Sequence, residues 1–250
     1  MEAIYLDRPL NFAHRGACKG APENTLAAFQ AAVPLGAEGI EFDVQFSKDK
    51  ELVVIHDFVL QTKTNGLGPV RAKTLAELKE LDAGASFSED FAGEPIPTLQ
   101  EVFDAVGDAL LLNIELKSQS LYGEGLAEAT VELVEKNRLV DRVVISSFQP
   151  FIINRVRRLN SRVPTGLLYS PDMSLILRKG WLRRVVRPWA LHPHHDMVDE
   201  AYMAWARQQG YRVHTWTADE PAELRRLVRC GVDIVITNRP DVFGHVLRGE

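Results

Sequence analysis

The sequence lacks the features that mark secreted, disulfide-stabilised and membrane-spanning proteins. It contains only two cysteines, Cys18 and Cys230, so no disulfide framework is expected. Its apolar stretches are too short to cross a bilayer, so no stable membrane association is expected. The N-terminal stretch "MEAIYLDRPL" has no basic region followed by an apolar run, which a secretory signal would have. We therefore expect a reduced, cytoplasmic setting.

The sequence also lacks an excess of positive charge. Its 29 Lys and Arg residues are outnumbered by 34 Asp and Glu residues, and the formal net charge is −5. Proteins that bind the phosphate backbone of nucleic acids are usually basic, so nucleic acid is not an expected partner. The composition does not fix an oligomeric state.

The composition suits one globular domain that spans residues 1–250. Hydrophobic residues make up 46% of the chain and charged residues 25%, values typical of a domain with a substantial core. A single domain of this length is ordinary for a (β/α)8 barrel, which typically has about 250 residues.

Short apolar runs rich in β-branched residues alternate with longer segments of helical periodicity. This alternation predicts an α/β fold in which helical crossovers connect parallel strands. The expected strands are LNFAH (10–14), GIEFDV (39–44), LVVIH (52–56), LLLNIEL (110–116), VVISSF (143–148), TGLLY (165–169), WALHP (189–193), RVHTW (212–216) and DIVIT (233–237). The expected helices occupy 24–36, 74–83, 98–107, 125–137, 150–160, 173–186, 198–210, 221–231 and a last segment from residue 240.

One of these strands is too many for an eight-stranded barrel. Only about "QFSKDKE" separates the second strand from the third, and a parallel crossover needs roughly a dozen residues or more. We therefore predict an antiparallel hairpin that sets Val53 opposite Gln45 and His56 opposite Phe42. The remaining eight strands predict a TIM barrel, with residues 44–97 as a small insertion after its second strand.

Polar residues follow the strands at the ends where barrel enzymes place their catalytic groups. Glu41 and Asp43 are two residues apart on one strand and share a face, as Glu115 and Lys117 do on another. The full set at these strand ends is His14, Arg15, Glu41, Asp43, Glu115, Lys117, Ser146, Ser147, His192 and Trp216.

These residue types together point to phosphoryl chemistry. Three converging carboxylates would repel one another unless a cation holds them, and all-oxygen ligands favour a hard ion such as Mg²⁺ or Ca²⁺. Arg15 and Lys117 would lie beside that ion, and cations next to a metal ion are favourable only if an anion binds with them. Phosphate fits best. His14 and His56 would transfer protons near neutral pH. The set predicts metal-assisted phosphoryl transfer with an acid/base pair.

Each residue taken alone has an ordinary structural interpretation. A Glu-x-Asp pair is usually a solvated strand face, and Asn24 is expected to cap the helix that Thr25 and Leu26 begin. The structural interpretation becomes less favoured only when the residues are considered together, because they all fall at strand ends, in order around one rim.

The order of short motifs resembles the glycerophosphodiester phosphodiesterase family in its short bacterial form. The motifs are "AHRG", "PENT", "EFDV", "VVIHD", "IELK", "HTWT" and "ITNRPD", and they run from Asn11 to about Asp241. The resemblance implies a barrel with an insertion after an early strand. It also implies hydrolysis of small glycerophosphodiesters to glycerol 3-phosphate and an alcohol.

The resemblance implies a role for each matching residue. One divalent cation, Mg²⁺ or Ca²⁺ with Mn²⁺ also possible, would be held by the metal ligands, and a His pair would act as acid and base. The metal ligands would be Glu41, Asp43 and Glu115, and the acid/base pair would be His14 and His56. Arg15 and Lys117 would hold the phosphate. Trp216 would line the glycerol group, and Glu23 and Asn24 would support the first loop.

The sequence departs from the family pattern after Trp216. Asp219 stands where many members have Asn, which puts any Asn contact there in doubt. His192 and His194 lie near the rim without an assigned role. The residues do not decide which His is the acid, which head group is preferred, or whether water or the glycerol 2-hydroxyl attacks.

Two other functions are open on the sequence. A related barrel phosphodiesterase acting on lysophospholipids or sphingolipids is the first alternative. Its support is the basic, apolar segment 173–189, whose cations are Arg178, Lys179, Arg183, Arg184 and Arg187. The least favoured alternative is a non-catalytic phosphate-binding barrel, which would require a broken metal triad or acid/base pair.

Overall fold

Eight parallel strands close into a barrel, as the alternation of strands and helices predicts. The computed structural model describes residues 5, 7–106, 109–174 and 182–250. The sheet order is β1-β9-β8-β7-β6-β5-β4-β2, and pairing of β1 with β2 closes it. The barrel strands are β1 (Leu10–His14), β2 (Gly39–Phe46), β4 (Leu111–Leu116), β5 (Val143–Ser147), β6 (Thr165–Tyr169), β7 (Ala190–Pro193), β8 (Arg212–Thr215) and β9 (Ile234–Thr237).

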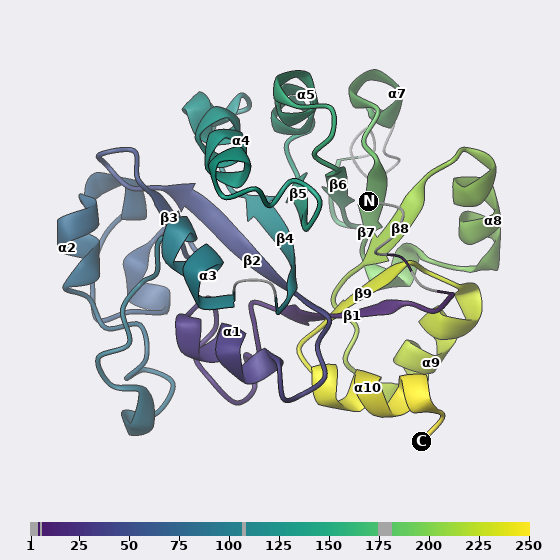
Figure 1. Cartoon of the computed structure of the whole chain (residues 1–250), viewed down its shortest axis with the longest axis horizontal. Helices are drawn as coiled ribbons and strands as arrows, with labels where there is room; N and C mark the ends of the chain where they lie inside the picture. Colours follow the sequence, from purple (N-terminus) through teal and green to yellow (C-terminus); the bar gives the residue numbers. More distant parts are fainter. Residues whose placement is uncertain (1–4, 6, 107–108, 175–181) are drawn as a thin grey trace.

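Helices surround the strands on the outside (Figure 1). They form where apolar residues recur at helical spacing, so that one face of each helix is buried. The described helices are α1 (Leu26–Ala32), α2 (Leu75–Lys79), α3 (Leu99–Val106), α4 (Leu126–Lys136), α5 (Pro150–Leu159), α7 (Arg183–Val186), α8 (Glu200–Gln208), α9 (Pro221–Cys230) and α10 (Pro240–Arg248).

The remaining strand, β3 (Leu52–Val54), pairs antiparallel with β2, which confirms the hairpin. Val53 lies opposite Gln45, as expected. The ladder ends at the pair Val44–Val54, so the expected pairing of His56 with Phe42 is wrong. The Ile55 backbone N–H still donates to the Asp43 carbonyl at 3.0 Å, and the chain then bends at residues 56–58.

Short helical turns connect β3 to α3 and cover their own small core. Helix α2 begins with a capping box, in which Thr74 and Glu77 each satisfy the other's backbone N–H. Buried apolar residues of this segment form a cluster separate from that of the barrel wall. Its fully buried members are Val53, Ile55, Leu60, Val70, Leu78 and Ile96.

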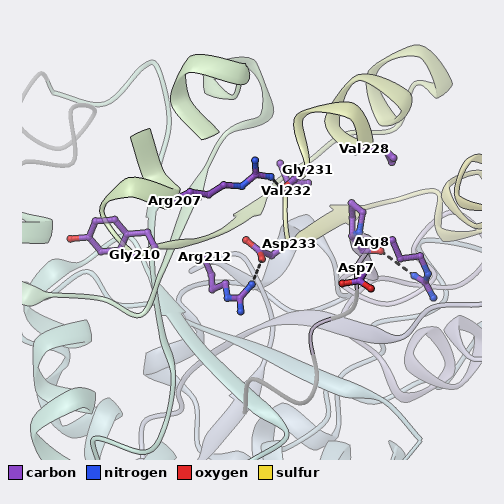
Figure 2. Close-up of a pocket in the computed structure, with 11 residues that line it drawn as sticks. Asp7, Arg8, Arg207, Gly210, Arg212, Val228, Gly231, Val232 and Asp233 are labelled. Atoms are coloured by element: carbon purple, nitrogen blue, oxygen red, sulfur yellow. Dashed lines mark hydrogen bonds and ion pairs between the residues drawn. The ribbon is translucent and has the colours of Figure 1, made fainter. Parts of the chain in front are cut away.

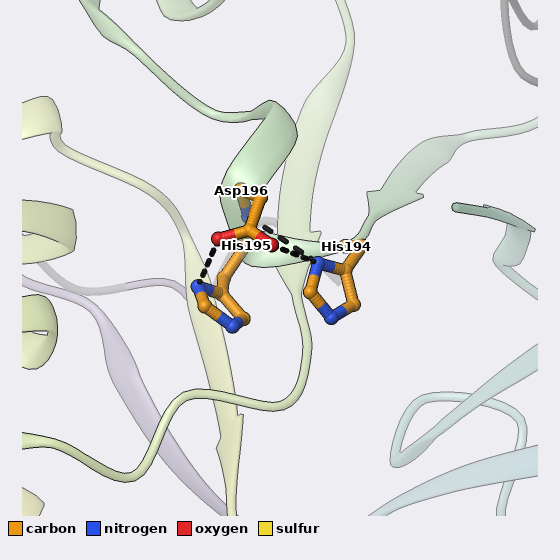
Figure 3. A group of neighbouring side chains, drawn as sticks. All are labelled: His194, His195 and Asp196. Atoms are coloured by element: carbon orange, nitrogen blue, oxygen red, sulfur yellow. Dashed lines mark hydrogen bonds and ion pairs between the residues drawn. The ribbon is translucent and has the colours of Figure 1, made fainter. Parts of the chain in front are cut away.

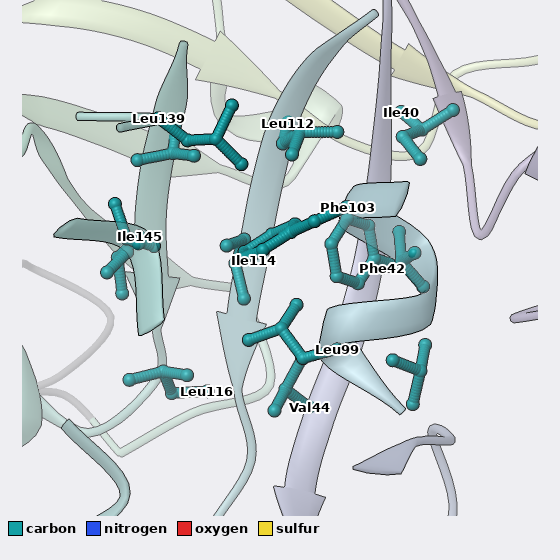
Figure 4. Close-up of a cluster of buried hydrophobic side chains, with 14 of the residues drawn as sticks. Ile40, Phe42, Val44, Leu99, Phe103, Leu112, Ile114, Leu116, Leu139 and Ile145 are labelled. Atoms are coloured by element: carbon teal, nitrogen blue, oxygen red, sulfur yellow. The ribbon is translucent and has the colours of Figure 1, made fainter. Parts of the chain in front are cut away.

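Alternation along β2 separates the core from the site. Ile40, Phe42 and Val44 belong to the buried apolar cluster that also contains Leu99 and Phe103 of α3. Figure 4 shows these α3 side chains lying over β2 and β4. Since successive strand residues point to opposite faces, Glu41 and Asp43, which alternate with these apolar residues of β2, point into the barrel. The same pleat that builds the core therefore presents the acidic residues of β2 inside.

The basic segment singled out in the sequence is described only in part. Arg178 and Lys179 lie outside the described residues, and Arg183 begins the short helix α7. The guanidinium of Arg183 lies 4.6 Å from the centre of the Trp205 ring. Within the described residues, no helix is long and apolar enough to cross a membrane.

Candidate active site

Three buried carboxylates meet at one end of the barrel. Glu41 and Asp43 come from β2, and Glu115 comes from β4, where it lies in register with Asp43. One oxygen from each lies within 4.8 Å of the others. Their residues are 4%, 1% and 8% exposed, respectively. The register of two parallel strands thus builds the acidic cluster that the Glu-x-Asp and Glu-x-Lys spacings predict.

Burial of this cluster makes ionisation of all three acids costly. Burial, followed by the charge of Asp43, raises the pKa of Glu41 well above its ordinary value. Burial also raises the pKa of Glu115 to about 7. Burial would raise the pKa of Asp43 as well, but Lys117 and Arg15 outweigh it and hold that pKa low. The trio therefore needs more positive charge than the protein supplies.

Two permanent cations lie against the acids. The Arg15 Nε lies 3.4 Å from Asp43 Oδ2, and the Lys117 Nζ lies 3.2 Å from Glu115 Oε1 and 3.6 Å from Asp43 Oδ1. Two cations do not balance three carboxylates. A hard divalent ion would supply the missing charge, and the donor set of three carboxylates suits such an ion. The residues present therefore fit a divalent cation.

The loop after β1 holds Arg15 through its neighbours. Arg15 donates to Glu23 Oε1 at 2.8 Å, and Lys63 lies 3.1 Å from the other Glu23 oxygen. Asn24 donates through Nδ2 to Asp43 Oδ2 at 2.9 Å, and its Oδ1 accepts from the Asp43 backbone at 3.3 Å. Glu23 and Asn24 thus orient a cation and a carboxylate of the site.

The expectation that Asn24 caps the first helix is wrong. Thr25 is the N-cap of α1, and its hydroxyl accepts from the Ala28 backbone N–H. Asn24 has a φ of 60°, a left-handed conformation that Asn tolerates better than most residues. Because Thr25 caps the helix, the Asn24 amide is not needed for capping and can bind Asp43.

Gly16 is required where the loop passes α1. Its φ is +80°, and a Cβ there would lie 2.7 Å from the Ala28 backbone. We predict that Gly16→Ala lowers the free energy of unfolding by about 2 to 4 kcal/mol, from left-handed strain plus the clash. It should also lower kcat, because Arg15 precedes it. Gly20→Ala is the matched control, since a Cβ there meets nothing closer than 3.9 Å. Equal effects of the two substitutions in a denaturant titration would contradict this account.

His14 lies at the end of β1 with its ring held on both sides. Its Nδ1 is 2.7 Å from Asn238 Oδ1, and its Nε2 is 3.8 Å from Glu41 Oε2. Burial, followed by the charge of Arg15, lowers the pKa of His14 to about 4. A neutral imidazole next to the carboxylates can accept a proton.

His56 follows β3 at the edge of the same site. Its Nδ1 lies 2.9 Å from Asp57 Oδ1, and its side chain is 29% exposed. Its charge contributes to holding the pKa of Asp43 low, after those of Lys117 and Arg15. The hairpin therefore delivers a second imidazole to the acidic cluster, although the imidazole lies beyond the paired part of β3.

An aromatic wall stands on the β7–β8 side of the rim. The Trp216 indole donates to the His192 backbone carbonyl at 2.9 Å. Phe148 and His194 each lie edge-on to the Trp216 ring, with centroids 5.5 and 5.3 Å away. His192 itself is fully buried inside the barrel, against the His214 ring at 4.5 Å.

His194, His195 and Asp196 form a second group of possible metal ligands. The Asp196 carboxylate lies between the two imidazoles (Figure 3), with N···O distances of 3.3 and 3.4 Å. His195 also contacts Glu223 at 2.7 Å, and Arg226 donates to the same carboxylate. This group contains one carboxylate, Asp196, which is exposed, whereas the triad gathers three buried carboxylates.

Sequence reasoning missed three residues that the structure brings to the site. Asn238 contacts His14 although 224 positions separate them, and Phe148 joins the wall of Trp216. Asn113 lies in register with Glu41, and its amide has no hydrogen-bond partner among the described residues. The "ITNRPD" motif contained Asn238, and the spacing Asn113–Glu115 placed both residues on one face.

A separate cavity of about 530 Å³ opens at the other end of the barrel (Figure 2). Arg207, Arg212 and Asp233 line it. The Arg212 guanidinium donates to Asp233 at 2.8 Å, and Arg207 donates to the Gly231 carbonyl at 2.8 Å. Arg212 therefore pairs with Asp233 inside this cavity, and Arg207 is held by a backbone carbonyl.

The chain is similar to known proteins along almost its whole length. Residues 14–242 match the model of the glycerophosphoryl diester phosphodiesterase family. A glycerophosphodiester phosphodiesterase of Caldanaerobacter subterraneus subsp. tengcongensis is 39% identical, over 96% of this chain and 98% of that protein. One of Bacillus subtilis is 33% identical, over 97% of this chain and 88% of that protein.

The fold is similar to that of solved structures. A phosphodiesterase of Oleispira antarctica, in complex with the product sn-glycerol-3-phosphate, superposes with a TM-score of 0.88. It is 30% identical, and the match covers 96% of this chain and 97% of that one. A glycerophosphodiester phosphodiesterase of Thermotoga maritima superposes with a TM-score of 0.76 at 27% identity, over 95% and 98% of the two chains.

Proposed function

Because the chain belongs to the glycerophosphoryl diester phosphodiesterase family, a family of phosphoric diester hydrolases, we propose that it hydrolyses glycerophosphodiesters. The products would be glycerol 3-phosphate and a free alcohol. The Oleispira antarctica structure supports this substrate class, since it contains glycerol 3-phosphate as product. The observation that carries the proposal is the buried carboxylate triad flanked by Arg15, Lys117 and two imidazoles.

One divalent cation, Mg²⁺, Ca²⁺ or Mn²⁺, would be held by Glu41, Asp43 and Glu115. When bound, it would polarise a phosphoryl oxygen and offset the negative charge of the diester. Oxygen-only ligands and the shortage of positive charge around these acids support a hard ion over zinc.

Arg15 and Lys117 would bind the phosphate. Arg15 has its guanidinium fixed by Glu23 and Asp43, and Lys117 has its ammonium fixed by Glu115. Cations held in place by other contacts stabilise developing charge without reorganising in the reaction. Trp216 would contact the glycerol group, and the edge-on ring of Phe148 supports its orientation.

His14 and His56 would move the protons. Each ring has its Nδ1 at a side-chain oxygen, Asn238 Oδ1 for His14 and Asp57 Oδ1 for His56. That contact orients each ring and leaves its Nε2 free to exchange a proton with the substrate. One imidazole would take the proton of the nucleophile, and the other would protonate the leaving alkoxide.

A hydrolysis panel tests the proposal. We expect glycerol 3-phosphate from glycerophosphocholine, glycerophosphoethanolamine and glycerophosphoglycerol in the presence of Mg²⁺ or Ca²⁺. A lysophosphatidylcholine arm, presented in micelles, separates the lysophospholipid alternative. Preferred hydrolysis of that lipid would contradict the proposed substrate class, and no hydrolysis of any diester with any ion would contradict the activity.

A further inference from the structure

Asp219 holds the side-chain amide of Asn238 at the end of the barrel next to His14. Asp219 Oδ1 accepts from the Asn238 backbone N–H at 2.8 Å and from the Thr237 hydroxyl at 3.0 Å. Asp219 Oδ2 accepts from Asn238 Nδ2 at 2.7 Å. The carboxylate is thus fixed by three donors, and one of them is the amide nitrogen of Asn238.

This contact decides which way the amide faces. An ionised carboxylate only accepts hydrogen bonds, so the NH₂ group of Asn238 must point at Asp219. Its oxygen then points the other way, to His14 Nδ1 at 2.7 Å. In the reversed orientation, the amide oxygen of Asn238 would face the Asp219 carboxylate, and two acceptors would repel each other. The hydrogen-bond partners therefore allow only one orientation of the Asn238 amide.

A thiol contacts the same oxygen of Asn238. Cys18 Sγ lies 3.1 Å from Asn238 Oδ1. Burial, followed by the charge of Glu23, raises the pKa of the Cys18 thiol to about 11, so the thiol keeps its proton and can donate. Two groups therefore meet an oxygen acceptor at this position.

We propose that Asp219 and Asn238 are positioning residues that fix the tautomer and the ring orientation of His14. Because Asn238 Oδ1 can only accept, His14 Nδ1 must carry the hydrogen. Its Nε2, on the Glu41 side, then has a free lone pair. The inference rests on the proposed function for its catalytic meaning, but the tautomer itself can be measured without a substrate.

Exchanging amide and acid tests the proposal sharply. In Asp219→Asn, the new NH₂ group faces Asn238, whose amide must turn to offer its oxygen. Its NH₂ group then faces His14 Nδ1, which selects the tautomer with hydrogen on Nε2. The double exchange D219N/N238D restores an acceptor for His14, because the carboxylate introduced at position 238 would accept both from the amide introduced at position 219 and from the imidazole.

We expect ¹⁵N NMR of histidine-labelled protein at neutral pH to show His14 with hydrogen on Nδ1 in the wild type. The His14 signals are assigned by their absence in His14→Gln. D219N should move the hydrogen to Nε2, and D219N/N238D should return it to Nδ1. An unchanged tautomer in D219N would overturn the proposal, and so would a double exchange that fails to restore it.

Kinetics separate the positioning role from a merely structural one. D219N should lower kcat by about 10- to 100-fold, part of the about 10²- to 10⁴-fold that a general acid or base contributes, with little change in KM. The double exchange should recover most of that loss, whereas a structural role predicts additive losses in thermal stability. Losses in kcat that follow thermal stability and add in the double exchange would overturn the proposal. If no variant, including the wild type, hydrolyses a diester, the proposed function fails and the tautomer measurement still decides this inference.

Discussion

Replacing Asp43 with asparagine is expected to abolish metal binding and to lower kcat by about 10³-fold or more. Asp43 lies at the centre of the cluster, 3.4 Å from Arg15, 3.6 Å from Lys117 and 2.9 Å from Asn24. A neutral amide of the same shape removes the carboxylate that stays ionised and leaves two cations facing two acids of raised pKa. The loss corresponds to several kcal/mol of transition-state stabilisation by the ion, at about 1.4 kcal/mol for each tenfold.

Asp233→Asn is the matched control for this substitution. Asp233 also binds an arginine, Arg212 at 2.8 Å, but it precedes β9 at the opposite end of the barrel. We expect its variant to lose some stability and to keep metal affinity, measured by isothermal titration, within a few-fold of the wild type. Equal loss of affinity in both variants would show that the carboxylate triad does not hold the ion.

Removing either imidazole of the site is expected to reduce turnover by about 10²- to 10⁴-fold, the contribution of a general acid or base. His14→Ala and His56→Ala should each keep the fold and bind the metal, because neither side chain belongs to the acidic triad. The double variant should lose much less than the product of the single losses, since the two groups act as a unit.

A substrate with an activated leaving group should separate the two roles. A p-nitrophenyl diester of glycerol 3-phosphate needs little protonation of its leaving group. It should therefore rescue the variant that lacks the acid far more than the variant that lacks the base. Near-normal turnover of glycerophosphocholine by either single variant would contradict the two-histidine mechanism. Equal rescue of both variants would contradict the division into acid and base.

The barrel could be predicted because the sequence of each strand is a short apolar run between amphipathic helices. The run LNFAH became β1 with no change in its bounds, and the seven residues between the second and third expected strands correctly excluded a parallel crossover. The segment between β3 and α3 could not be predicted in detail. Its turns follow from tertiary packing around Leu60, Val70 and Leu78, and local propensity does not encode that packing.

The site could be predicted where chemistry follows from spacing within one strand. Glu41 and Asp43 share a face of β2, and a known strand order places Glu115 beside them. The contacts of Asn24 and Asn238 could not be predicted, because each depends on the direction of a side-chain amide across the fold. For His192, the position at a strand end predicted a place at the rim, but the ring is buried in the barrel interior.

The central claim is that the triad of Glu41, Asp43 and Glu115 binds one divalent ion that diester hydrolysis requires. The most direct measurement is a titration of exhaustively chelated protein with Mg²⁺, Ca²⁺ or Mn²⁺, following the release of glycerol 3-phosphate from glycerophosphoethanolamine. We predict no detectable hydrolysis before addition and recovery that saturates at one tightly bound ion for each chain. Full activity of the chelated protein would contradict the account, and so would recovery that is unchanged in Asp43→Asn.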